Sequence, residues 1–239
     1  MKRFLLYQAR NTTDIVRPEE QKAFAYQLQT SIECVDTIDV LTEELTTARA
    51  MEYDGILVGG AGEYSVLDDD IRIKKFISHL GDLTTTDLPM FASCFGFQAL
   101  VLALGGTVIK DIPHAEVGTY QLRTTPEAKQ DSVFSILPGT FLAQMGHQDR
   151  ADSLPSNVTN FAYSENVPYQ AFHVHNTHVY ATQFHPELSF EENRKRFARY
   201  MKIYGALFGQ EEAQRRMDSH RPSPESNQLL KQFYDVVVS

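Results

Sequence analysis

The chain has 239 residues, 42% of them hydrophobic and 22% charged, a composition typical of a soluble globular protein with one large core. Its 31 acidic residues outnumber the 22 basic ones, which gives a formal net charge of −9. No basic cluster is present to meet phosphates or anionic lipids, so this composition argues against nucleic acid and membrane surfaces as partners.

The beginning of the chain lacks the pattern of a signal peptide, and no apolar run has the length of a membrane span. Cys34 and Cys94 are the only cysteines, and although they could pair, two cysteines do not form a disulfide framework. We therefore expect a cytoplasmic protein whose cysteines stay reduced.

The first half of the chain alternates strand-like and helix-like segments. Short apolar runs predict strands over residues 3–9, 32–40, 53–60 and 88–93. Helical spacing and helix-start signals predict helices over residues 17–29, 42–51, 70–80 and 95–104. Strands separated by helices imply right-handed crossovers and a parallel sheet covered on both faces.

The second half changes to strand-like segments with short connections. We expect strands over residues 116–125, 140–147, 160–165, 169–175 and 178–185, the last two forming a hairpin. A helix over 189–208 begins with the capping box of Ser189 and Glu192. The predicted fold class is thus α/β, with a mostly parallel central sheet flanked by helices and an additional antiparallel region in the second half.

We expect one domain over residues 1–209, followed by a polar C-terminal extension over 210–239 that is not a separate domain. Within this extension, residues 227–238 could dock as a helix or a strand, or could fray.

Cys94, in the stretch "PMFASCFGFQAL", stands where a buried strand turns into a helix. A nucleophile on such an elbow is exposed above the sheet, and the positive end of the helix favours its thiolate form. Small residues, Ala92 and Gly96, flank the cysteine at two before and two after. On this stretch alone, a buried and inert cysteine is the somewhat better interpretation.

The stretch "QFHPEL" (183–188) changes that balance. It places His185 at a strand end and Glu187 two residues later, where a base for a thiol and a carboxylate that orients its imidazole are needed. Alone, such a pair is more often a solvated turn.

Together, "VGGAGEYSV", "SCFGFQ" and "QFHPEL", in this order, resemble the class I (triad) glutamine amidotransferases, most closely stand-alone members related to the amidotransferase domain of GMP synthase. The resemblance runs from about residue 50 to residue 190. The segment "AQMGHQDRADSLP" (143–155) is similar to one in the same group. Two departures are Ala92, where the family usually has glycine and a methyl should be tolerated, and a longer glycine-rich loop.

The resemblance implies a flavodoxin-like fold and a role for each matching residue. Cys94 would be the nucleophile, His185 the general base and then acid, and Glu187 the orienting carboxylate. The amides of Gly60 and Phe95 would form the oxyanion hole, although Gly59 or Ala61 could replace Gly60 as donor. The expected substrate contacts are Gly59, Gln98, His147, Gln148 and Asp149.

The implied reaction is hydrolysis of the side-chain amide of glutamine through a γ-glutamyl thioester, with no metal or organic cofactor. The ammonia would pass to a separate synthetase subunit. An alternative is a γ-glutamyl peptidase that cleaves γ-glutamyl peptides without a partner. A third possibility is an inactive regulatory or binding subunit, against which the intact Cys94, His185 and Glu187 argue.

The histidines at positions 173, 175, 178 and 185 cluster in the sequence, and a metal site among them is conceivable. Because His185 is assigned to catalysis and the hairpin turn separates 175 from 178, we expect solvent-exposed hairpin histidines instead. Cys34 lies in an apolar strand and is expected in the core.

Overall fold

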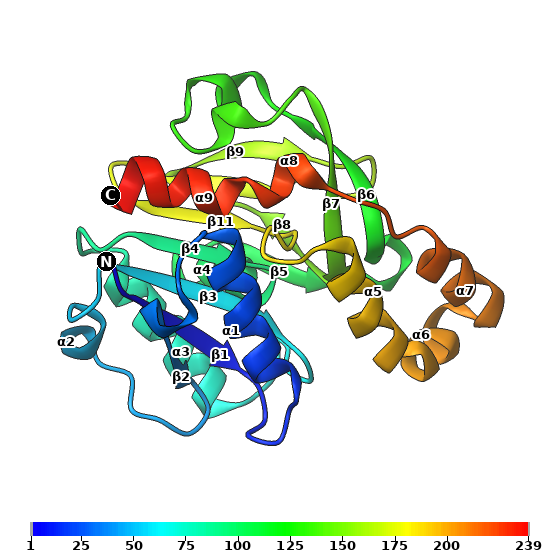
Figure 1. Cartoon of the computed structure of the whole chain (residues 1–239), viewed down its shortest axis with the longest axis horizontal. Helices are drawn as coiled ribbons and strands as arrows, with labels where there is room; N and C mark the ends of the chain where they lie inside the picture. The colour runs from blue at the N-terminus through cyan, green and yellow to red at the C-terminus, as the bar shows by residue number, and fades with distance from the viewer. Residues whose placement is uncertain (1, 239) are drawn as a thin grey trace.

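A computed structural model describes residues 2–238 of the chain. Within them, eleven strands alternate with helices in the order shown in Figure 1. The strands are β1 (Phe4–Ala9), β2 (Val35–Asp39), β3 (Gly55–Ala61), β4 (Met90–Ser93), β5 (Thr107–Lys110), β6 (Glu116–Thr124), β7 (Thr140–His147), β8 (Asp149–Ser153), β9 (Val158–Tyr163), β10 (Ala171–Val174) and β11 (Val179–Thr182). The α-helices are α1 (Val16–Gln27), α2 (Thr47–Ala50), α3 (Ile71–Leu83), α4 (Phe95–Ala103), α5 (Phe190–Arg199), α6 (Met201–Phe208), α7 (Gln210–Asp218), α8 (Pro224–Asn227) and α9 (Leu229–Phe233).

Nine of these strands form one mixed sheet in the order β2-β1-β3-β4-β11-β10-β9-β6-β7. The pairs from β2 to β11 are parallel, and those from β11 to β7 are antiparallel. The predicted α/β class, with a parallel half and an added antiparallel region, is confirmed.

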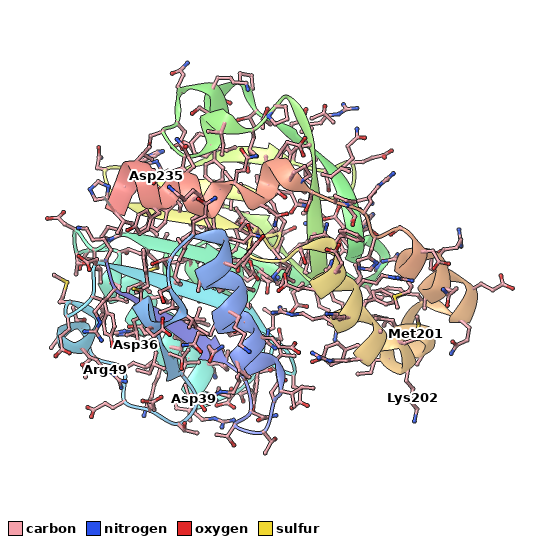
Figure 2. The ribbon with its side chains drawn as sticks, in the orientation of Figure 1. Asp36, Asp39, Arg49, Met201, Lys202 and Asp235 are labelled. Carbon is pink, nitrogen blue, oxygen red and sulfur yellow. The ribbon has the colours of Figure 1, made fainter. Side chains whose placement is uncertain are left out.

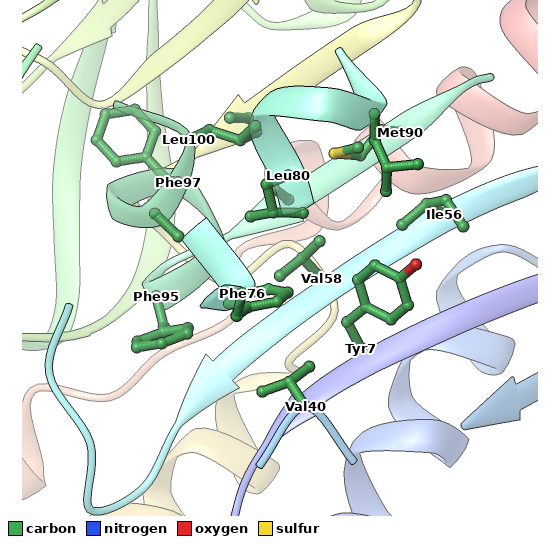
Figure 3. Close-up of a cluster of buried hydrophobic side chains, with 14 of the residues drawn as sticks. Tyr7, Val40, Ile56, Val58, Phe76, Leu80, Met90, Phe95, Phe97 and Leu100 are labelled. Carbon is green, nitrogen blue, oxygen red and sulfur yellow. The ribbon is translucent and has the colours of Figure 1, made fainter. Parts of the chain in front are cut away.

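Alternate residues of the parallel strands face two separate cores, as the two-residue period of a strand requires. Leu5 and Tyr7 of β1 point to one face of the sheet, where α3 and α4 cover them (Figure 3). Phe4 and Leu6 point to the other face, toward α1 and α9. Because both faces are covered, β1 and β3 read as continuous apolar runs rather than as alternating patterns.

The C-terminal extension packs onto this second face. Its side chains Leu229, Leu230 and Phe233 are fully buried, and the Phe233 ring meets Phe91 of β4 edge-on at 5.5 Å between centroids. Residues 227–238 therefore dock as helix. The division at residue 209 stays a prediction.

Several predicted elements are wrong in extent. Residues 32–34 form a 3₁₀ turn before β2. The helix predicted over 42–51 is reduced to α2, because Thr46 caps it by accepting from the amide of Arg49. The helix over 189–208 is divided at Tyr200 into α5 and α6. Two short strands, β5 and β8, were not predicted and pair with each other as a separate ribbon.

Figure 2 shows labelled side chains on opposite sides of the molecule. Asp36 and Asp39 of β2 and Arg49 of α2 lie at one edge of the parallel sheet. Met201 and Lys202 of α6 lie at the opposite side, beyond the sheet. Within residues 2–238 no helix combines the length and the apolar character needed to cross a lipid bilayer.

Candidate active site

The predicted site residues gather where the parallel strands end. Cys94 follows β4, Gly60 lies near the end of β3, and His185 comes three residues after β11. Since β3, β4 and β11 are neighbouring parallel strands, their carboxyl ends meet at one edge of the sheet. This edge is where open α/β sheets bind ligands.

Cys94 occupies a sharp elbow between β4 and α4. Its backbone has φ 52° and ψ −101°, a conformation that non-glycine residues rarely adopt, and its amide donates to the carbonyl of Thr182 at 2.8 Å. Such strain persists only where the surroundings hold it in place, and it turns the side chain up into the cleft at the start of the helix. Cys94 remains 8% exposed there.

The close approach of α4 to the sheet explains the small residues around the elbow. A methyl group on Gly96 would lie 2.7 Å from Cγ1 of Val58 and 3.0 Å from Cβ of Ala92. The methyl of Ala92 is fully buried in this contact. Position 96 therefore has to be glycine while position 92 carries alanine.

His185 and Glu187 form a buried pair beside Cys94. Nδ1 of His185 lies 2.6 Å from Oε1 of Glu187, and the imidazole shares the cleft beside Gly60 with the Cys94 side chain. Glu187 is fully buried, and its Oε2 has no hydrogen-bond partner among the described residues. Its backbone is fixed from the C-terminal extension, because Nδ2 of Asn227 donates to the carbonyls of Pro186 and Leu188, both at 2.8 Å.

The charges of the three side chains are coupled. Burial alone lowers the pKa of His185, but the negative charges of Glu187 and Cys94 and its hydrogen bonds to both raise that pKa to about 10. Burial raises the pKa of Glu187, yet the positive His185 brings it below its ordinary value. The arrangement therefore keeps a proton on the imidazole at neutral pH, ready for donation to a leaving group.

The glycine-rich loop after β3 passes directly over the catalytic side chains. A methyl group on Gly60 would lie 3.0 Å from Cε1 of His185 and 3.9 Å from Cβ of Cys94. Gly59 faces the other way, where a methyl group on its α-carbon would lie 2.6 Å from the carboxylate carbon of Glu20. Gly60, rather than Gly59, is thus the glycine beside the cysteine.

Glu20 is itself held in a buried ion pair. Nη2 and Nε of Arg10 donate to its two carboxylate oxygens at 2.9 and 3.2 Å, and Gln8 donates a third hydrogen bond at 3.0 Å. Arg10 is 4% and Glu20 0% exposed. The buried pair of Arg10 and Glu20 therefore packs against Gly59 of the glycine-rich loop, on the side that faces away from Cys94.

His147, Gln148 and Asp149 form another wall of the same cleft. The ring of His147 is locked between Oε2 of Glu116 and the carbonyl of Asp149, at 3.0 Å each. Nε2 of Gln98 also donates to the Asp149 carbonyl, at 2.7 Å. The amide of Gln98 thus holds the turn between β7 and β8, and the backbone of that turn lines the cleft.

These side chains share one cleft of about 530 Å³. Cys94, Phe95, Gln98, His147, Gln148, Asp149 and His185 all line it, whereas Gly59, Gly60 and Glu187 do not; the glycine-rich loop lines it through Ala61 and Gly62. A cysteine at a helix N-terminus, a charged histidine and a buried carboxylate are the parts of a nucleophilic hydrolase.

Comparison with known proteins decides the family. The family model "Glutamine amidotransferase class-I" matches residues 21–202. The chain belongs to this family.

The relatives of this amidotransferase include enzymes named GMP synthase [glutamine-hydrolyzing]. The protein of Nitratiruptor sp. is 31% identical over 152 residues, which are 63% of this chain and 28% of the relative. That of Thermosipho melanesiensis is 32% identical over 142 residues, 59% of this chain and 25% of the relative. The chain thus spans about a quarter of the length of these relatives.

Solved structures share the fold. A glutamine amidotransferase from Thermotoga maritima superimposes with a TM-score of 0.73 at 19% identity, covering 100% of both chains. A glutamine amido transferase from Methylobacillus flagellatus gives 0.69 at 16% identity, over 98% of this chain and 93% of that one.

The amidotransferase cleft also contains residues that the sequence did not single out. Arg10, Arg196, Tyr200 and Tyr204 line it together with the residues described above. The sequence did contain an indication for Arg10, because this charged residue directly follows an apolar strand that is fully buried. Nothing in the sequence separates Arg196 from Arg194 and Lys195, its neighbours on the same amphipathic helix.

The clustered histidines have separate partners. Nδ1 of His173 lies 3.1 Å from Asp131 and its ring stacks on Tyr180, while His175 bonds Thr159. His173 is therefore partly buried rather than solvent-exposed, which corrects that expectation. Over residues 2–238, no group of three or more His, Cys, Asp or Glu side chains is arranged to hold a metal ion.

Proposed function

We propose that this chain is a hydrolase that cleaves the γ-amide bond of glutamine or a related γ-glutamyl compound, with Cys94, His185 and Glu187 as its catalytic triad. The observation that supports the proposal is the placement of Cys94 and His185 side by side in one cleft, both next to Gly60, with Oε1 of Glu187 2.6 Å from Nδ1 of the imidazole.

The reaction begins with attack of the Cys94 thiolate on the γ-carbonyl carbon. A C–S bond forms, and the oxygen takes up negative charge between the amides of Phe95 and the glycine-rich loop. Each such donor lowers a barrier by about 3 kcal/mol. Phe95 is the first residue of α4, so its amide has no partner within the helix and is free to act.

His185 then gives its proton to the leaving nitrogen as the C–N bond breaks, leaving a γ-glutamyl thioester. The neutral imidazole takes a proton from water, whose oxygen attacks the thioester. The thiolate leaves, glutamate is released, and both side chains return to their starting charges. Glu187 stabilises the charged imidazole at both ends of this cycle.

With glutamine as substrate, the product is ammonia, and we propose that a synthetase unit outside these 239 residues consumes it. The GMP synthase relatives support this candidate. So does a structural neighbour from Thermoplasma acidophilum, described as a putative GMP synthase component, with a TM-score of 0.62 at 20% identity over 85% of this chain and 98% of that one.

A second candidate is cleavage of γ-glutamyl peptides without a partner. The size of the cleft favours it, because about 530 Å³ lies within the range of pockets that hold drug-sized molecules, well beyond one amino acid.

The test is release of ammonia and glutamate by the purified chain. We expect ammonia from glutamine, no turnover by Cys94→Ala, and retained turnover by Cys34→Ala, since Cys34 is buried away from the cleft. Glutamate released from a γ-glutamyl dipeptide without ammonia from glutamine would select the second candidate. Retained activity in Cys94→Ala would refute the triad.

A further inference from the structure

Arg196 is an unpaired cation in the catalytic cleft. It is a partly buried residue of α5 and lines the cleft, yet its guanidinium has no hydrogen bond or ion pair with any residue in the range 2–238. The other arginine in the cleft, Arg10, is paired with Asp14 and Glu20. Arg199, one turn further along α5, is paired with Glu19.

The guanidinium of Arg196 keeps its charge in this position. Burial lowers its pKa below the ordinary value of 12.5, while Glu20 and Glu187 act in the opposite direction through their charges. An arginine stays protonated at neutral pH under such a shift. A charged, partly desolvated guanidinium without a partner destabilises the folded protein, unless a bound ligand supplies the opposite charge and the hydrogen bonds.

Two tyrosines complete the same wall. Tyr200 and Tyr204 line the cleft, and neither hydroxyl has a hydrogen-bond partner within the described part of the chain. The Tyr200 hydroxyl lies 3.2 Å from where a methyl on Gly62 would be, so it points at the glycine-rich loop. Tyr204 lines the same cleft as Cys94, and burial, then the charges of Tyr200 and Cys94, raise the pKa of its hydroxyl to about 12.

This wall is distinct from the one that the proposed function assigns to the glutamyl end of the substrate. The turn carrying His147 to Asp149 is held by Glu116, Gln98 and Ser65. The charge of Arg196 instead interacts with Arg10, Glu20 and Glu187. If the amino-acid end of the glutamyl group binds at the turn of residues 147–149, the side of the cleft with Arg196 is left for the group beyond the scissile amide.

We propose that Arg196, with the hydroxyls of Tyr200 and Tyr204, binds a carboxylate on the leaving amine, so that the preferred substrates are γ-glutamyl amino acids and short γ-glutamyl peptides. Arginine binds a carboxylate through two parallel hydrogen bonds, and tyrosine hydroxyls can donate further ones. The inference rests on the proposed cleavage of a γ-glutamyl amide at Cys94. His185 then gives its proton to the amine nitrogen, and the amino acid leaves with its carboxylate intact.

The test compares two substrates that differ only in this carboxylate, γ-glutamylglycine and γ-glutamylglycinamide. We expect the wild type to favour the acid in kcat/KM, mainly through KM. Arg196→Gln should reduce that preference by roughly 10- to 100-fold, the range for a lost charged hydrogen bond. Lys195→Gln removes the same charge from an exposed neighbouring position on α5 and should keep the preference.

Equal kcat/KM for the two substrates in the wild type would overturn the proposal. So would an Arg196→Gln variant that loses the same factor on both peptides and on glutamine, because Arg196 would then support the fold or bind the glutamyl end.

A separate measurement distinguishes failure of the proposed function from failure of the carboxylate site at Arg196. If the wild type hydrolyses no γ-glutamyl compound, calorimetry on Cys94→Ala still decides the subsite. Tighter binding of the acid than of the amide, lost in Cys94→Ala/Arg196→Gln, supports it. Equal binding of the two overturns it.

Discussion

The close packing of α4 against the sheet predicts that Gly96→Ala destabilises the protein. In Gly96→Ala, the new methyl would lie 2.7 Å from Cγ1 and 2.8 Å from Cβ of Val58. Carbon atoms pack at about 3.5 Å or more, so α4 has to move by most of an ångström. Val58 and Ala92 belong to central strands β3 and β4 and cannot give way.

Overpacking of this kind costs about 1–3 kcal/mol, against a helix-propensity gain of at most about 1 kcal/mol for replacing glycine by alanine. Because the methyl would clash with both Val58 and Ala92, we place the cost at about 2–3 kcal/mol, the upper part of this range. The net loss should therefore be about 1–2 kcal/mol, a fall in Tm of roughly 2–8 °C for a chain of this size. Because α4 begins at Cys94 and Phe95, activity should fall further, by about 100-fold for a displacement near 1 Å.

The matched control is Gly81→Ala. Gly81 also lies within a helix, but its nearest neighbours would be the carbonyl oxygen of Ala103 at 3.5 Å and Cβ of Ala103 at 3.8 Å, ordinary contacts. This variant should be as stable as the wild type or up to about 1 kcal/mol more stable. Thermal and urea unfolding, with an activity assay, measure both. A Gly96→Ala protein at least as stable as the wild type would refute the reasoning.

Three further predictions concern the support of the site. Glu20→Gln removes the fully buried carboxylate that pairs with Arg10 and leaves only the partly exposed Asp14 as its charge partner, so it should cost about 3–5 kcal/mol in urea unfolding. Glu19→Gln breaks an exposed pair and should cost less than about 1 kcal/mol; equal losses would contradict this. The folded-state pKa of His185 is raised from 6.5 to about 10, so its protonation stabilises the fold fully below pH 6.5 and this contribution is lost as the pH rises through 10. Glu187→Gln should lower that pKa in an NMR titration and flatten the dependence of stability on pH over the same window; an unchanged titration would show that the carboxylate does not act on the imidazole. Asn227→Ala removes two 2.8 Å hydrogen bonds from the segment carrying Glu187, so it should cost about 1–3 kcal/mol and lower kcat, and wild-type kcat would show that the C-terminal extension does not position the triad.

The parts of the fold that were predictable carry their signal locally. The strands β1, β3 and β4 are apolar because both faces of the sheet are covered, and Gly105 stops a helix whose apolar residues begin directly after Cys94. The strands β5 and β8 have no such signal. Each is short and partly exposed, and their pairing joins residues about 40 positions apart, so only the folded chain defines it.

The residues of the site also fall into those that the sequence could predict and those that it could not. Cys94, His185 and Glu187 stand in short motifs that could be read from the sequence, and the structure brings them together in one place. Arg196 and Tyr200 could not be assigned, because their position depends on the break between α5 and α6, which no glycine or proline marks. Glu20 could not be distinguished from Glu19 on α1, although one is buried and the other exposed.

The proposed hydrolysis requires Cys94 to be the nucleophile. The most direct measurement is mass spectrometry of the protein after exposure to an electrophilic glutamine analogue. We predict one covalent adduct, on Cys94, which forms more slowly in the presence of excess glutamine or γ-glutamylglycine and at a much lower rate in His185→Ala. An adduct on Cys34 alone, or continued hydrolysis by protein whose Cys94 is fully modified, would contradict the account.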